Sequence, residues 1–154
     1  MNHAQHAAQP SVTRMALDAT RHCLTGCAIG EIVGLLVSGA LGLTIEASIV
    51  AGIVLAFVFG YSLTFVPLLR GGMAPGQAIG VTAAADTISI VVMETVDNLI
   101  VLFVPGAIAA GLTDALFWGS LGLGLVIAFA VAFPVNRWLI ARGRGHVLAH
   151  GAHS

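Results

Sequence analysis

Two cysteines and a glutamate recur at intervals of four residues along one apolar segment. Cys23, Cys27 and Glu31 stand at positions i, i+4 and i+8, so a helix would place them in a row on one face. Two thiols separated by four residues are about 6 Å apart along a helix axis, which suits a soft metal ion better than an unstrained disulfide. His22 adjoins the first thiol, and imidazole favours the same metals. Alternatively, the cysteines are small apolar packing residues of a membrane interior.

A second group of polar side chains interrupts the apolar segment at about 76–104. At 100° per residue, Asp86, Met93 and Asp97 fall on one helix face, and Glu94 lies beside them. Acids inside a membrane are costly and persist mainly for function or internal pairing. Asp97 can alternatively cap a helix break near the membrane surface, but that interpretation leaves the other two acids unexplained.

The depths of these groups predict a graded column. Glu31 is nine residues beyond His22 and Asp86 is nine residues beyond Gln77, so both are expected at matching depth, about 13 Å into the membrane. The chain has no lysine, and we expect its arginines at or beyond the ends of the membrane spans, so these acids must be protonated, share protons or hold a cation. The predicted metal site, with thiols and histidine at its cytoplasmic mouth, comprises His22, Cys23, Cys27, Glu31, Asp86, Met93, Glu94 and Asp97.

Transmembrane helices are the elements that must position these side chains. Of the 154 residues, 58% are hydrophobic and 8% are charged, whereas a soluble domain carries about 25% charged residues. Four apolar stretches each reach the roughly 20 residues that span a bilayer. They lie at about 23–43, 47–69, 76–104 and 115–140.

The connections between these stretches are short, so neighbouring helices should be antiparallel. Asp114 is expected to N-cap the fourth helix. The sequence therefore predicts an all-α membrane protein with an antiparallel bundle of four transmembrane helices. We expect a polar N-terminal tail at 1–21, the bundle at 22–142 and a His-rich C-terminal tail at 143–154.

Small residues repeat at every fourth position of the first apolar segment. Small side chains at this spacing let another helix backbone approach closely in a membrane. We interpret the stripe as structural. Its members are Gly26, Gly30, Gly34, Ser38 and Gly42.

The arginines predict the orientation. Arg14 and Arg21 precede the first helix, Arg70 lies between the second and third, and the other three lie at the end of the fourth or beyond it. The two remaining loops hold acids, Glu46 and Asp114, and no basic residue. We therefore expect a multi-pass protein of the cell (inner) membrane. The positive-inside rule places both of its termini on the cytoplasmic side.

Four short motifs are shared with a known group of proteins. Through them the chain resembles, over about 22–145, an uncharacterised bacterial membrane-protein family known only as a domain of unknown function. The resemblance implies a helical membrane protein, and it implies no activity and no functional residues. The motifs are His22-Cys23-x-x-Gly26-Cys27, Ala85-Asp86-Thr87-x-Ser89, Met93-Glu94-x-x-Asp97-Asn98 and Pro134-Val135-Asn136-x-Trp138.

The leading functional hypothesis is binding or transport of a transition-metal cation, copper or zinc, through the thiol and carboxylate column. Thiolate and imidazole favour Cu(I) or zinc. Besides the lipid bilayer, we expect a second copy of the chain as partner, because four helices are too few to enclose a wide path. The net charge of −1 implies no attraction to nucleic acid.

Three alternatives stay open. A membrane thiol oxidoreductase would use Cys23 and Cys27, but their spacing is Cys-x-x-x-Cys rather than Cys-x-x-Cys, and a regular helix strains such a bridge. The sequence therefore favours a protein that is not an enzyme. A proton-coupled transporter of another solute would use Glu31, Asp86 and Glu94 as a proton relay, with incidental thiols. The last alternative is a structural accessory membrane subunit.

Overall fold

The computed structural model describes residues 11–142, which form four long α-helices and one short 3₁₀ helix. All four long helices are long and apolar enough to cross a membrane. This confirms the predicted all-α architecture with four helices that are capable of spanning a membrane. The elements are α1 (Val12–Leu41), α2 (Ile45–Arg70), α3 (Pro75–Phe103), η1 (Ala107–Ala109) and α4 (Ala115–Ala141).

Side-chain caps begin three of the four long helices. The Ser11 hydroxyl caps α1, and the Thr44 hydroxyl caps α2. Asp114 Oδ1 accepts a 2.8 Å hydrogen bond from the Leu116 backbone N–H, so the predicted N-cap of α4 is confirmed. Gly42 ends α1 with a φ of 62°, in the left-handed region that glycine adopts without steric cost.

The first helix begins earlier than predicted. Residues 12–21, expected in a polar tail, belong to α1. Ala16 and Thr20 are both fully buried, so the small buried face of α1 continues through this segment. Small side chains permit close helix packing from Ala16 on, and packing stabilises a helix more than the composition of the segment alone suggests. The predicted tail at 143–154 lies outside the described residues.

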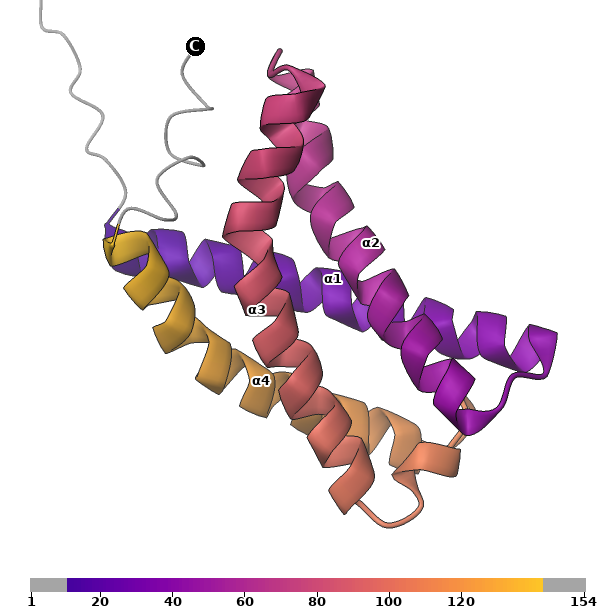
Figure 1. Cartoon of the computed structure of the whole chain (residues 1–154). Helices are drawn as coiled ribbons and strands as arrows, with labels where there is room; N and C mark the ends of the chain where they lie inside the picture. Colours follow the sequence, from indigo (N-terminus) through magenta and orange to yellow (C-terminus); the bar gives the residue numbers. More distant parts are fainter. Residues whose placement is uncertain (1–10, 143–154) are drawn as a thin grey trace, which may run out of the picture.

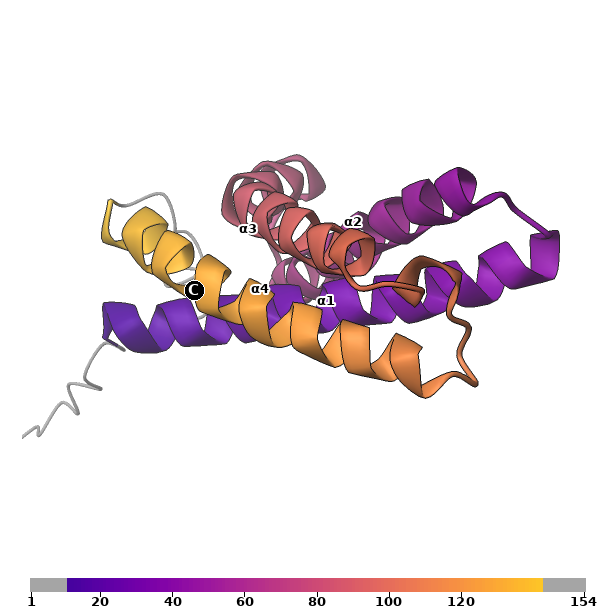
Figure 2. The ribbon, with the colours of Figure 1, turned by 90° about the horizontal axis from the view of Figure 1, so that it is seen from below.

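The four helices do not form a regular bundle with nearly parallel axes. Figure 1 shows α2 and α3 converging on the turn that joins them and running obliquely across α1. The C-terminal end of α4 lies beside the N-terminal end of α1, as Figures 1 and 2 both show. The start of α1 and the end of α4 therefore lie together, and the turn between α2 and α3 lies away from them.

The side chains in the interior of this fold are smaller and more polar than those on its surface. Phe103 is 80% exposed and Val126 is 68% exposed, whereas buried positions are occupied largely by alanine, glycine, hydroxyl and acidic side chains. A soluble protein of this length would bury its large apolar side chains. Large apolar groups outside and small or polar groups inside are what a lipid environment favours.

The α1–α2 interface is built on the small-residue stripe. A Cβ added to any of three α1 glycines would collide with the α2 backbone, so the two helices approach closely. The structural interpretation of the stripe is confirmed at these positions. The facing pairs are Gly26 with Gly60, Gly30 with Ala56, and Gly34 with Gly52.

Candidate functional site

The predicted row of α1 side chains lies inside the molecule. Cys23 and Cys27 are 2% and 3% exposed, and both are free thiols. Glu31, two turns further than Cys23, is half-buried. The helical period thus carries all three side chains to one face of α1, as expected from their spacing.

The predicted face of α3 is buried as well. Asp86, Met93, Glu94 and Asp97 are each no more than 5% exposed. Large apolar residues such as Leu99 point outward. The calculated helix face is therefore confirmed, and the three acids lie in the protein interior instead of at a water-facing surface.

At the first level of the site, Cys23 meets Asp86. The Cys23 Sγ donates to Asp86 Oδ1 across 3.9 Å. Thr64 of α2 lies beside Asp86, and its Oγ1 is 3.1 Å from Nε2 of His22. Polar side chains therefore connect His22 to Asp86 by way of Thr64.

At the second level, Cys27 of α1 lies against Glu94 of α3. Met93 belongs to the same buried cluster as both cysteines. Two thiols and one thioether therefore occupy one region of the core, a ligand chemistry that suits a soft cation.

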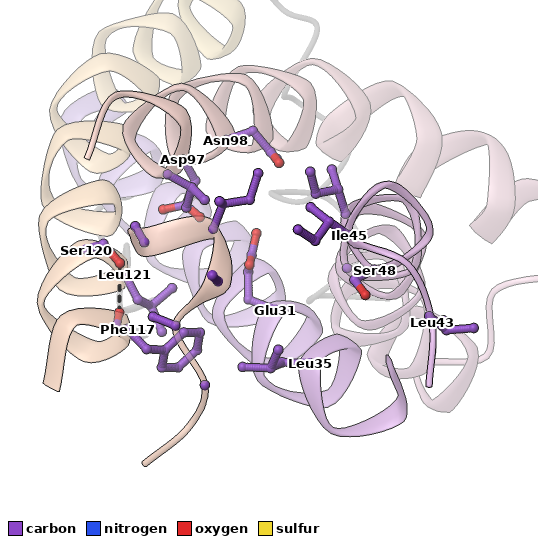
Figure 3. A pocket seen from close by; sticks show the side chains of 18 residues that line it. Glu31, Leu35, Leu43, Ile45, Ser48, Asp97, Asn98, Phe117, Ser120 and Leu121 are labelled. Atoms are coloured by element: carbon purple, nitrogen blue, oxygen red, sulfur yellow. Dashed lines mark hydrogen bonds between the residues drawn. The ribbon is translucent and has the colours of Figure 1, made fainter. Parts of the chain in front are cut away.

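At the third level, Glu31 of α1 lies against Asp97 of α3. Both acids line a pocket of about 390 Å³, together with Asn98, the first turns of α2 and α4, and the η1 segment. Figure 3 shows the Glu31 and Asp97 carboxyl groups on the wall of this pocket. Gly124 of α4 makes room for Asp97, because a Cβ there would collide with Asp97 Oδ1.

The expected match in depth between Glu31 and Asp86 is wrong. Glu31 has Asp97 and Glu94 as its acidic neighbours, and the polar neighbours of Asp86 are Cys23 and Thr64. Counting residues from the start of each apolar stretch assumes that both helices begin at one level and run parallel to the membrane normal. The oblique crossing of α3 and the early start of α1 remove that basis.

The acids of the site lack basic partners. Among residues 11–142, the polar neighbours of Asp86, Glu94 and Asp97 are thiols, a hydroxyl and other carboxyl groups. Both carboxyl oxygens of Glu94, both of Asp97 and one of Asp86 accept no hydrogen bond from the described residues. Buried polar atoms are ordinarily satisfied, so these oxygens have capacity for a proton, water or a cation.

Six of the eight predicted site residues form three facing pairs instead of one chelating cage, and His22 and Met93 lie outside these pairs. Within residues 11–142, no group of three or more His, Cys, Asp and Glu side chains is close enough to hold a metal ion. The sulfur cluster and the Glu31–Asp97 pair are the two places where ligands of one chemical type gather. Within the described residues, the arrangement therefore offers paired side chains at successive levels and no complete set of metal ligands.

A hydrogen-bonded node next to the first level was not predicted. Asn136 Nδ2 of α4 donates to Thr20 Oγ1 of α1 at 2.8 Å and to Ser89 Oγ of α3 at 3.0 Å. Ser89 also lies beside Cys23. An asparagine near the end of an apolar segment was the available signal, but nothing local in the sequence indicated its partners on two other helices.

Comparison with known proteins places the chain in a group without an assigned activity. A family model described as a domain of unknown function, DUF4396, matches residues 13–145. No curated protein and no solved structure matches the chain significantly.

Proposed function

The chain belongs to the DUF4396 family, a family of unknown function, and we propose that it binds and moves a transition-metal cation, copper or zinc, along the column between α1 and α3. One observation carries this proposal: each of the three polar side chains on the buried face of α1 lies against an acid of α3. Unpartnered carboxyl oxygens in such an interior favour the uptake of a positive charge.

The sulfur ligands favour copper over zinc. Cys23, Cys27 and Met93 share one buried cluster, and thiolate with thioether is a soft ligand set that selects Cu(I). Zinc ordinarily takes four ligands in a tetrahedron, which the paired arrangement does not offer. Successive weak sites also suit conduction, because an ion must be able to leave each one.

The column has a proposed direction. By the positive-inside rule, both termini and the Arg70 turn lie on the cytoplasmic side of the cell (inner) membrane. The His22 level is then the cytoplasmic mouth and the pocket at Glu31 and Asp97 opens outward. Reporter fusions at Thr44 and at the C-terminus should report opposite sides, and a periplasmic C-terminus would reverse the column.

Copper loading of the full chain in mild detergent tests the proposal. Replacing Cys23 and Cys27 with serine changes side-chain size little, so the double variant should keep its helical content and lose bound Cu(I). Met93→Leu conserves volume and should weaken Cu(I) binding. Met73→Leu, in the turn between α2 and α3, is the matched control and should bind copper normally. Equal copper content in the double variant and the wild type would overturn the proposal.

A second candidate is proton movement along the same column. It is favoured by the polar connection from His22 through Thr64 to Asp86, which needs no metal. In vesicles carrying a pH-sensitive dye, proton flux would then survive the double cysteine replacement and fall in Asp86→Asn. The metal proposal expects the cysteine variant to lose cation uptake.

A further inference from the structure

The pocket at Glu31 and Asp97 is lined by oxygen-bearing side chains and by no sulfur-bearing side chain. Its wall includes carboxyl groups from Glu31 and Asp97 and neutral oxygens from Ser48, Asn98 and Ser120. These residues come from all four long helices, as Figure 3 shows around the labelled side chains. A volume of about 390 Å³ holds several water molecules, each of which occupies about 30 Å³ in the liquid.

Asp97 is the fixed ligand of this pocket. Its side chain is 5% exposed, and neither carboxyl oxygen has a hydrogen-bond partner among residues 11–142. The absence of a side chain at Gly124 leaves the carboxyl group in place against α4. Glu31, half-buried on α1, brings a second carboxyl group to the same wall.

We propose that this pocket binds a hard divalent cation that keeps part of its water shell, with Glu31 and Asp97 as its carboxylate ligands. Cations such as Mg²⁺ bind through one or two carboxylates and retain several waters. Two acids in a cavity that holds several water molecules are therefore sufficient to bind such a cation. Oxygen ligands favour magnesium, calcium and manganese, whereas the sulfur cluster favours Cu(I). The site is therefore chemically distinct from the copper site proposed above, and it does not depend on the thiols.

Mn²⁺ is a suitable probe, because the electron paramagnetic resonance signal of the free ion reports binding directly. Titrated into the full chain in detergent, Mn²⁺ should bind at a single saturable site. Asp97→Asn and Glu31→Gln should each weaken binding by at least about tenfold. Glu46→Gln removes an exposed acid at the start of α2, near the same end of the molecule, and should leave binding unchanged.

A pair of glycine variants separates loss of the site from loss of charge. Gly124→Ala keeps both acids but displaces the Asp97 carboxyl group, and should weaken Mn²⁺ binding while helical content is retained. Gly122→Ala introduces its methyl group where nothing lies within 4 Å, and should bind normally. Failure of the wild type to bind Mn²⁺, or equal binding by wild type and Asp97→Asn, would overturn the inference.

The cysteine double variant keeps this inference separate from the proposed copper function. It should bind Mn²⁺ with wild-type affinity after losing Cu(I). A wild type that binds Mn²⁺ but no copper would overturn the proposed function and support the pocket. A wild type that binds copper but no Mn²⁺ would do the reverse.

Discussion

Helix α1 presents two different faces at the same spacing of about four residues. The face toward α2 carries glycines, and the backbones of the two helices come into close contact there. The face toward α3 carries thiols and a carboxyl group, each lying against an acid. The glycine face consists of Gly26, Gly30 and Gly34, and the polar face of Cys23, Cys27 and Glu31.

The difference shows how stability and chemistry are divided within one helix. The three glycines bring no polar side chain into the interface, and close packing is one of the forces that join helices in lipid. The polar face opposes acidic oxygens that have no hydrogen-bond partner among residues 11–142. Such groups are costly to bury, so we infer that the glycine face stabilises the fold and holds the polar row opposite α3.

The largest expected effect comes from breaking the glycine face. In Gly30→Ala the new methyl group would collide with the backbone of Ala56, which cannot move as a side-chain tip can. Overpacking of a core typically costs about 1–3 kcal/mol and occasionally more. We expect a loss at the upper end of this range, about 3 kcal/mol, in thermal or denaturant unfolding of the detergent-solubilised chain.

Gly39→Ala is the matched control on the same helix. Nothing lies within 4 Å of a Cβ at Gly39, so stability should hold or rise slightly through the better helix propensity of alanine. Equal losses in the two variants would show that the α1–α2 contact is not specially close. The inference that the glycine face of α1 stabilises the fold would then be wrong.

Sequence periodicity predicted what depends on a single helix. The polar row of α1, the acidic face of α3 and the Asp114 cap each follow from spacing or local chemistry, and the structure contains all of them. Composition likewise sufficed to predict four helices capable of spanning a membrane.

Relations between helices could not be predicted in this way. Whether Glu31 faces Asp86 or Asp97 depends on the crossing angle and axial shift of α3, which many side chains decide together. The node at Asn136 joins positions more than forty residues apart in sequence. The pocket is lined by residues of all four long helices and the η1 segment, and no local pattern in the sequence indicates that these residues come together.

A smaller loss of stability is expected where side-chain hydrogen bonds join α4 to α1 and α3. Asn136→Ala removes the donor to both Thr20 and Ser89 and leaves a small cavity. Hydrogen bonds between membrane helices average about 0.6 kcal/mol, so two bonds and the lost packing should cost about 2 kcal/mol in the same unfolding measurement.

The control for this loss is Ser62→Ala. The Ser62 hydroxyl is exposed and donates only to the Val58 carbonyl of its own helix, so its removal should leave stability unchanged. If Asn136→Ala also left stability unchanged, these hydrogen bonds would not stabilise the packing of α4 against α1 and α3, and apolar contacts alone would do so. The contrast with the glycine face would then be one of residue type and not of the forces involved.

The smallest effect tests which acids act together on the polar face. Glu31 lies against Asp97, so the stability changes of Glu31→Gln and Asp97→Asn should not add, and a double-mutant cycle should give a coupling of about 1 kcal/mol. Glu31 and Asp86 share no polar neighbour, so their changes should add to within about 0.5 kcal/mol. Amide replacements preserve size, and each cycle is measured by unfolding in one detergent. Coupling of Glu31 to Asp86 with additivity toward Asp97 would restore the pairing by depth that residue counting suggests. It would also remove the carboxylate pair from the pocket, because the two acids on its wall would then belong to different levels of the column.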